Sequence, residues 1–316
     1  MTTQRPIAYF VRALPDARAE RLSEVLDIRG GQAHPPSREA LLAEAAEATV
    51  LVVTYLDHVD RELLRGLPHL RHLASYGVGV NHIDLEACRG RDILVTNTPG
   101  VLTEATADMA MALLLAATRR VAEADRTIRA GGWVEVNPAW MLGTQVTGKT
   151  LGLVGFGRIG QAVARRAAGF EMQILYSNPC QIDFAGARRV SLEALLRDSD
   201  FVSLHVPLRR ETENLLSRQR IFGMKRGAVL VNTARGELVD DAALAEALAS
   251  GHLAGAGLDT FRAEPRVPEA FLRLPNVVLT PHLGSGTRET RGAMSAMVLE
   301  EIVRVARGLP PRFRVA

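Results

Sequence analysis

The sequence predicts an α/β protein built from two doubly wound parallel-sheet domains joined by long helices. Short β-rich runs alternate with Ala-, Leu- and Arg-rich helical runs along the whole chain, which is typical of parallel sheets. A glycine fingerprint, Gly155–Gly160, lies between an apolar run and a helical run. The length of 316 residues is enough for two ordinary domains.

The first stretch of the chain carries four strand-like runs separated by helical ones. The strands are expected at Ile7–Val11, Val50–Thr54, Leu70–Ser75 and Ile93–Thr96. The helices are expected near Ala17–Leu26, Arg38–Ala48 and Arg61–Leu67.

A long helical run, Thr103–Ala130, follows Asn97–Gly100 and ends at a pair of glycines. Its length exceeds the average helix of about 11–12 residues, so we expect it to bridge two domains. An irregular arm, Trp133–Gly148, comes next and is rich in turn formers and aromatic residues.

A second α/β unit begins at Lys149. Its strands are expected near Thr150–Val154, Gln173–Ser177, Phe201–His205, Ala228–Asn232, Leu253–Leu258 and Val277–Thr280. The last helix, near Thr287–Ala306, follows the final strand and can return to the first unit. We therefore expect a discontinuous first domain at 1–98 plus 287–316 and a second domain at 99–286.

Composition narrows the class of protein. Apolar residues make up 47% and charged residues 23%, as in soluble globular proteins. The net charge is only +3 and the arginines are scattered, so nucleic acid is not an expected partner. Two cysteines, Cys88 and Cys180, exclude a disulfide framework and a cysteine-rich metal site. The longest apolar run, Met109–Ala117, is far shorter than the ~20 residues of a membrane span, so we expect no membrane binding. The small number of cysteines fits a reducing compartment, so we expect a cytoplasmic protein without a metal site.

The fingerprint Gly155-Phe156-Gly157-Arg158-Ile159-Gly160 predicts dinucleotide binding. The first glycine permits a tight turn, the second lets the backbone approach a pyrophosphate, and the third lets helix and strand pack closely. A plain tight turn is the alternative, which the strand–turn–helix context disfavours.

The end of the next strand bears on the choice between NADH and NADPH. An NAD site usually carries Asp or Glu about 20 residues after the fingerprint, to bind the ribose 2′-hydroxyl. Here the segment Ser177-Asn178-Pro179-Cys180 has no acid before Asp183, and Ser177 and Asn178 can donate hydrogen bonds to a 2′-phosphate. This favours NADP(H) over NAD(H). Arg158, Arg188 and Arg189 are further candidates for a cation there, and a loop that accepts either cofactor is the alternative.

Three later strands end on residues suited to hydride-transfer chemistry. They lead to Arg235, to Asp259 with Glu264 beyond it, and to His282. A guanidinium can bind a carboxylate and polarise a carbonyl, and an imidazole can supply a proton near neutral pH. A neighbouring Glu264 would favour the imidazolium form and orient the ring. Each residue alone has a structural alternative: a surface ion pair, a turn entry, a loop histidine.

Together these segments resemble the D-isomer-specific 2-hydroxyacid dehydrogenase family. The matching segments are Asn97–Gly100, Gly155–Gly160, Asn232–Gly236, Asp259–Pro265 and Thr280–Ser285. The resemblance implies a flavodoxin-like substrate domain at 1–98 plus 287–316 and a Rossmann dinucleotide-binding domain at 99–286, around a cleft. It also implies a homodimer. It implies Arg235, Glu264 and His282 as catalytic residues, with Asp259 on the nicotinamide side. The cofactor-binding candidates are completed by His205, Pro207, Thr233 and Ala234.

The family's substrate loop matches Ser75–Val80. By that resemblance the amides of Val78 and Gly79 bind the substrate carboxylate. Tyr76 either lines the pocket or packs within the loop. Trp140 of the arm either reaches a partner's active site or is buried in the dimer interface.

Within the family the chain is most similar to glyoxylate/hydroxypyruvate reductases and 2-ketogluconate reductases. The expected activity is reduction of glyoxylate or hydroxypyruvate, with 2-ketogluconate or another D-2-hydroxyacid reaction as the alternative. A non-catalytic dinucleotide sensor like the co-repressors of this fold is the rival from another class. The presence of Arg235, Glu264 and His282 together favours the enzyme.

Overall fold

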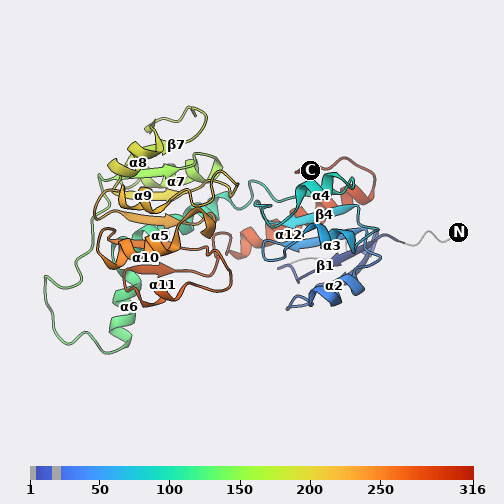
Figure 1. Cartoon of the computed structure of the whole chain (residues 1–316), viewed down its shortest axis with the longest axis horizontal. Helices are drawn as coiled ribbons and strands as arrows, with labels where there is room; N and C mark the ends of the chain where they lie inside the picture. Colours follow the sequence, from blue (N-terminus) through green and yellow to red (C-terminus); the bar gives the residue numbers. More distant parts are fainter. Residues whose placement is uncertain (1–4, 16–22) are drawn as a thin grey trace. The chain divides into compact units, whose positions relative to one another are not determined.

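Two parallel sheets organise the chain (Figure 1). The structure, a computed structural model, describes residues 5–15 and 23–316. It divides into two compact units: unit 1 is Met1–Leu102 with Thr287–Ala316, and unit 2 is Thr103–Gly286. Every strand pair within the two sheets of the described residues is parallel, which confirms the predicted α/β class. Most of the expected helix Ala17–Leu26 lies outside the described residues.

The sheet of unit 1 has the strand order β2-β1-β3-β4-β5. Its strands are β1 (Ile7–Phe10), β2 (Asp27–Gly30), β3 (Val50–Thr54), β4 (His72–Tyr76) and β5 (Leu94–Thr96). The strand order reverses between β1 and β3, the kind of switch point at which such sheets form a crevice. The sequence did not predict β2, because Asp27-Ile28-Arg29-Gly30 is a short, polar edge strand without apolar alternation.

Helices cover both faces of this sheet. They are α2 (Arg38–Glu44), α3 (Arg61–Arg65), α4 (Leu85–Arg89) and α12 (Arg288–Ala306). Asp60 and Asp84 cap α3 and α4 by accepting from backbone amides of the first turn. The first three helices share one apolar core with the strands, and α12, red in Figure 1, covers the other face through Met294, Val298 and Ile302.

The sheet of unit 2 has the order β12-β11-β10-β9-β6-β7-β8. Its strands are β6 (Thr150–Val154), β7 (Gln173–Ser177), β8 (Ala187–Arg189), β9 (Phe201–Leu204), β10 (Val229–Asn232), β11 (Gly255–Leu258) and β12 (Val277–Leu279). The switch point lies between β6 and β9. The short edge strand β8, Ala-Arg-Arg, is again one that the sequence did not predict.

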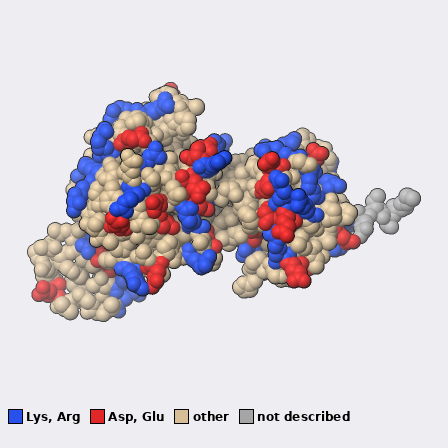
Figure 2. Space-filling model, in the orientation of Figure 1, with Lys and Arg blue, Asp and Glu red and all other residues tan. Residues whose placement is uncertain are grey.

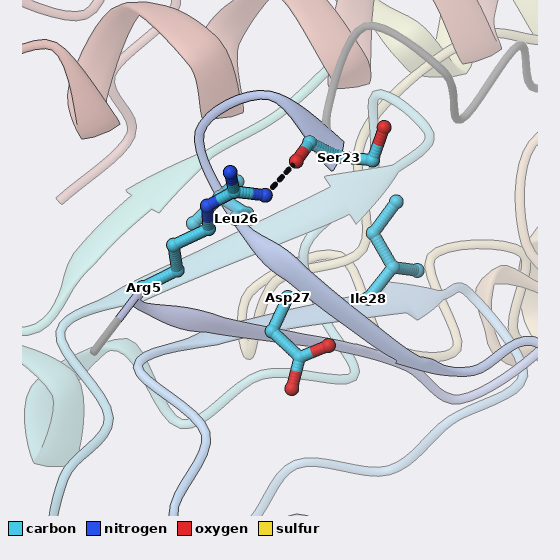
Figure 3. Close-up of a pocket in the computed structure, with 5 residues that line it drawn as sticks. All are labelled: Arg5, Ser23, Leu26, Asp27 and Ile28. Atoms are coloured by element: carbon cyan, nitrogen blue, oxygen red, sulfur yellow. Dashed lines mark hydrogen bonds between the residues drawn. The ribbon is translucent and has the colours of Figure 1, made fainter. Parts of the chain in front are cut away.

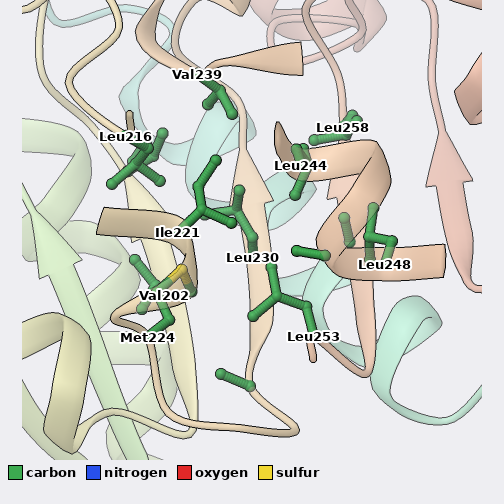
Figure 4. Packing of buried hydrophobic residues seen from close by; sticks show 14 of the residues in the cluster. Val202, Leu216, Ile221, Met224, Leu230, Val239, Leu244, Leu248, Leu253 and Leu258 are labelled. Carbon is green, nitrogen blue, oxygen red and sulfur yellow. The ribbon is translucent and has the colours of Figure 1, made fainter. Parts of the chain in front are cut away.

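Helices also cover both faces of this second sheet. They are α5 (Thr103–Thr118), α7 (Arg158–Ala168), α8 (Leu192–Asp198), α9 (Arg218–Phe222), α10 (Asp241–Ala249) and α11 (Glu269–Arg273). The helix α6 (Val121–Arg129) follows α5 and has no buried residue. Alternate strand residues point to opposite faces. Val202, Leu230 and Leu258 pack against α9 and α10 (Figure 4), whereas the other face packs against α5 and α7. Because the strands are parallel, their carboxyl ends lie along one edge of the sheet.

The predicted helix Thr103–Ala130 is instead two helices, α5 and α6. Arg120 adopts a left-handed conformation with φ 56° and ends the first helix. Its side chain bonds both carboxylate oxygens of Glu123 at 2.8 Å. No Gly or Pro marks the break, so helical propensity alone could not reveal it. In the described ranges, the structure contains no helix whose length and apolarity would let it cross a membrane.

Candidate active site

The glycine fingerprint turns sharply from β6 into α7. Gly155 has φ +91°, and a Cβ there would lie 2.7 Å from the carbonyl carbon of His205, which follows the neighbouring strand β9. A Cβ on Gly160 would lie 2.4 Å from the Gly155 carbonyl oxygen. Both positions therefore require glycine, one for conformation and contact and the other for close packing.

Gly157 has a different role, because a Cβ there would meet no protein atom within 4 Å. It is the N-cap of α7 and makes no side-chain cap bond, so the amides of the first turn are left to another partner. Open space beside uncapped helix amides fits a pyrophosphate. Phe156 is fully buried, stacks on Tyr176 with ring centroids 4.1 Å apart, and so holds the turn in place. The residues present fit a dinucleotide.

The segment after β7 lies against this turn. Gly155 donates its amide hydrogen to the Ser177 carbonyl at 2.8 Å. Phe156 donates to Asn178 Oδ1 at 3.3 Å, and Asn178 Nδ2 donates to the Cys180 carbonyl at 3.0 Å. Ser177 and Asn178 thus lie next to the fingerprint, where the sequence predicts the adenosine ribose.

Arg235 follows β10 and is held by Asn232, a residue that the sequence reasoning did not place in the site. Asn232 is 1% exposed, donates from Nδ2 to the Arg235 carbonyl at 2.7 Å and accepts from the Ala234 amide at 3.0 Å. Its side chain therefore closes the turn that presents the guanidinium. Its place at the end of a buried strand was the signal that could have identified it.

Glu264 and His282 are in direct contact. His282 Nδ1 and Glu264 Oε2 are 2.8 Å apart, and each side chain is 18% exposed. The other carboxylate oxygen of Glu264 accepts from the Phe261 amide at 3.0 Å. Burial alone would raise the pKa of Glu264, but the hydrogen bond and charge of His282 and the Phe261 amide outweigh it and hold that pKa below its ordinary value. The carboxylate therefore stays ionised beside the imidazole at neutral pH.

Asp259 is fully buried and holds the loop that carries His282. Its carboxylate accepts from Thr280 Oγ1 at 2.6 Å and from the amides of Leu283 and Gly284 at 2.7 Å. Burial raises the pKa of Asp259, although these hydrogen bonds and the nearby His282 oppose the rise. His282 itself has φ 53° and donates its amide hydrogen to the Asp259 carbonyl. Strain of this kind persists only where surrounding bonds impose it.

The remaining cofactor candidates lie at the same edge of the sheet. His205 follows β9, lies 2.9 Å from Ser203 Oγ, and has its pKa lowered to about 4 by desolvation. The Pro207 carbonyl accepts from Thr212 Oγ1 at 2.8 Å. Thr233, beside Ala234, has a buried hydroxyl that no group among the described residues satisfies. A buried hydroxyl without a partner is available to a ligand.

The predicted substrate loop belongs to unit 1 and follows β4. Tyr76 is 7% exposed and donates its hydroxyl to the Arg291 carbonyl at 3.0 Å, a geometry that favours packing over lining a pocket. Val78 is 39% exposed, and its carbonyl accepts from Asn97 Nδ2 at 2.9 Å. Gly79 continues the loop. Trp140, in the arm of unit 2, is 40% exposed.

A hollow of about 520 Å³ in unit 1 does not belong to this site (Figure 3). It is lined by Arg5, Ser23, Leu26, Asp27 and Ile28. These residues lie at the amino ends of β1 and β2, whereas ligands of parallel sheets bind at the carboxyl ends. Over residues 5–15 and 23–316, no group of three or more His, Cys, Asp or Glu is arranged to hold a metal ion.

Comparison with known proteins identifies the family. Residues 111–284 match the model described as "D-isomer specific 2-hydroxyacid dehydrogenase, NAD binding domain". The chain belongs to this family. A glyoxylate reductase of Korarchaeum cryptofilum is 48% identical to this dehydrogenase, over 97% of this chain and 95% of the relative.

Solved structures agree. A protein from Thermus thermophilus is 46% identical and superimposes with a TM-score of 0.93, covering 98% of this chain and 99% of the other. An NADPH-dependent glyoxylate/hydroxypyruvate reductase from Sinorhizobium meliloti, solved with NADP and malonate, is 33% identical with a TM-score of 0.88, covering 99% and 97%. The chain is therefore an NAD(P)-dependent 2-hydroxyacid dehydrogenase, and the alternative of a non-catalytic dinucleotide sensor is disfavoured.

Proposed function

We propose that this dehydrogenase reduces glyoxylate and hydroxypyruvate to the corresponding 2-hydroxy acids, with His282 as the proton donor. The observation that carries the proposal is the 2.8 Å contact between His282 Nδ1 and Glu264 Oε2. The names of the Korarchaeum cryptofilum and Sinorhizobium meliloti relatives support this choice of substrates.

The catalytic residues divide the work. Glu264 accepts a hydrogen bond from the Nδ1–H of His282, which orients the ring and leaves Nε2 to give a proton to the carbonyl oxygen of the substrate. The ionised carboxylate also stabilises the imidazolium. Arg235 binds the substrate carboxylate and polarises its carbonyl through a planar, permanently charged fork. The bound nicotinamide supplies the hydride.

The two units take different tasks in this proposal. The domain at 99–286 binds the dinucleotide through the fingerprint, and the domain at 1–98 plus 287–316 binds substrate. The amides of Val78 and Gly79 bind the carboxylate of the substrate, because successive backbone amides form a site for an anion. Asp259 holds the His282 loop beside the nicotinamide.

NADPH is the preferred cofactor in this proposal. The segment Ser177–Cys180 carries no carboxylate that would repel a 2′-phosphate. The Sinorhizobium meliloti relative is described as NADPH-dependent, which supports the same choice.

The working form in this proposal is a homodimer in the cytoplasm. Apolar side chains are exposed on the arm and on α6, and the arm is mostly tan in Figure 2. These exposed side chains are Val121, Ile128, Trp133, Val134, Val136, Trp140 and Leu142. Several large apolar side chains exposed on one segment and the helix before it are typical of protein interfaces. Sedimentation of V134S/V136S as a monomer, with wild type as a dimer, is the expected result; a monomeric wild type would refute the dimer.

The test of the activity is His282→Ala with glyoxylate and NADPH. We expect kcat to fall by about 10²–10⁴, the typical contribution of a general acid, while the cofactor still binds. His58→Ala, at an exposed histidine of unit 1, is the matched control and should leave turnover unchanged. Near-normal turnover of His282→Ala would refute the role of His282, and a wild type inactive on every 2-oxo acid would refute the activity.

A further inference from the structure

The ribose loop, Ser177–Cys180, contains no ionisable carboxylate or cation of its own. Two contacts described above, Gly155 to the Ser177 carbonyl and Phe156 to Asn178 Oδ1, hold it against the fingerprint. A charged group that reaches this loop from elsewhere therefore sets its electrostatic character.

Arg189 is such a group. It is the last residue of β8 and lies in register with Tyr176 of β7, one residue before the loop. Its Nε donates to the Asn178 carbonyl at 3.0 Å, and its Nη2 donates to the Pro179 carbonyl at 2.6 Å. The guanidinium is thus fixed on the loop by two backbone acceptors.

These two bonds leave charge and donors to spare. A guanidinium has five N–H donors, and Arg189 is exposed. None of the ion pairs formed within residues 5–15 and 23–316 involves Arg189. Its positive charge is therefore not neutralised by a carboxylate, and the bonds to the loop limit the freedom that it would lose on binding an anion.

The other two candidate arginines differ. Arg188 precedes Arg189 on β8, so strand alternation directs its side chain to the opposite face. Arg158 begins α7 beside Gly157, where the pyrophosphate is expected. Of these three arginines, Arg189 is the one whose guanidinium bonds to the ribose loop in the described structure.

We propose that Arg189 is the specificity-determining residue for a 2′-phosphorylated adenosine ribose. The proposal rests on the proposed dinucleotide site. It assigns to an arginine on the edge strand β8 the task for which the ribose loop has no cation. It also explains how a loop of Ser, Asn, Pro and Cys can favour NADPH rather than merely tolerate it.

The first experiment measures binding without catalysis. Calorimetric titrations compare 2′,5′-ADP with 5′-AMP on wild type, Arg189→Ala and the neighbouring control Arg188→Ala. Wild type and Arg188→Ala should bind 2′,5′-ADP about tenfold or more tightly than 5′-AMP, because 5′-AMP lacks the 2′-phosphate and so cannot form the charge-assisted hydrogen bond with Arg189. Arg189→Ala should bind the two nucleotides within about twofold. An undiminished preference in Arg189→Ala would overturn the proposal.

The second experiment separates phosphate recognition from simple support of the loop. With glyoxylate as substrate, Arg189→Ala should raise KM for NADPH about tenfold or more and change KM for NADH by less than about twofold. Arg189→Lys keeps the charge but loses the fork, so its KM for NADPH should lie between the other two. Equal increases for both cofactors would mean that Arg189 only holds the loop and would also overturn the proposal.

The two experiments also distinguish this proposal from the proposed activity. A protein that binds 2′,5′-ADP through Arg189 but reduces no 2-oxo acid would refute the activity and support the ribose assignment. A protein that reduces glyoxylate equally well with either cofactor, before and after substitution of Arg189, would support the activity and refute the ribose assignment.

Discussion

The two sheets have the same kind of switch point, but different residues fill the space at the carboxyl ends of its two strands. In unit 1, between β1 and β3, Arg12 Nε lies 2.8 Å from Asp57 Oδ1. The second oxygen of Asp57 accepts from the amide and hydroxyl of Thr54 at 2.8 Å. In unit 2, between β6 and β9, the corresponding first turn is Gly155-Phe156-Gly157.

The difference shows that a parallel sheet supplies a crevice but not a cofactor site. In unit 1 the protein's own ion pair bridges the ends of the two switch-point strands. In unit 2 the glycines remove side chains, and the space at Gly157 and the amides of α7 are left to a ligand. The residues of the first turn, rather than the strand order, therefore decide which crevice can take a pyrophosphate.

The largest expected effect is a loss of NADPH affinity when the space at the glycine turn of unit 2 is filled. Gly157→Ala should weaken NADPH binding by roughly 10- to 100-fold, because an extra methyl in a tight contact costs about 1–3 kcal/mol. The melting temperature should not change, since this Cβ meets no protein atom within 4 Å. Fluorescence titration and thermal unfolding measure the two quantities.

Gly160→Ala is the matched control on the same turn. Its Cβ would lie 2.4 Å from the Gly155 carbonyl oxygen, so it should lower the free energy of unfolding by about 1–3 kcal/mol. If Gly157→Ala and Gly160→Ala behaved alike in both measurements, the distinction between ligand space and packing space would be wrong.

A smaller effect, on the free energy of unfolding, is expected from the ion pair at the switch point of unit 1. Arg12→Ala should lower the free energy of unfolding by about 1–3 kcal/mol, because the Asp57 side chain, 8% exposed, loses its cation. Chemical denaturation measures this change. Arg38→Ala removes an exposed ion pair with Asp60 and should cost at most about 1 kcal/mol. Affinity for NADPH should stay at the wild-type value in both variants, and a loss in Arg12→Ala would contradict the assignment of the dinucleotide to the sheet of unit 2.

The smallest effect concerns pH and unit 1. His72 is 1% exposed, and burial lowers its pKa to about 4 from an ordinary 6.5. The unfolded state therefore binds the proton first, and stability falls as the pH drops from 6.5 towards 4. From pH 7.5 to 5.5 the contribution of His72 should fall by about 1 kcal/mol.

Denaturation of wild type and His72→Gln at several pH values measures this term. The variant should lose about 1 kcal/mol of the pH dependence, because glutamine does not titrate in this range. A wild type whose stability rises on acidification from pH 7.5 to 5.5, or a variant with the same slope, would count against a neutral buried His72.

Much of the candidate site could be predicted because its residues follow strands that are apolar throughout. Buried strands such as Val229–Asn232 are visible in sequence, and the residue after each one must reach the carboxyl edge of the sheet. The partnership of Glu264 with His282 was expected on the same grounds, and their side chains are in contact. The roles of these residues in catalysis stay predictions.

What escaped prediction depends on residues without periodic patterns. Arg120 ends a helix with no glycine or proline to mark it. Asn232 was not placed in the site, although its position at the end of a buried strand was a signal. Asp259 was expected on the nicotinamide side, but its bonds to the amides of Leu283 and Gly284 join segments far apart in the chain, which no local pattern encodes. Arg189 was named as a candidate cation, but its position was not predicted, because it lies on an edge strand too short and too polar to be recognised.

The amino-acid sequence by itself determined the parallel α/β class, the glycine turn and the chemical types available at the strand ends. It could do so because burial, chain reversal and close backbone approach are local demands that restrict residue type. Tertiary structure alone decided which partners meet: Arg12 with Asp57, and Arg189 with the ribose loop. Such contacts depend on the register of neighbouring strands and the directions of side chains, which become defined only when the sheet assembles.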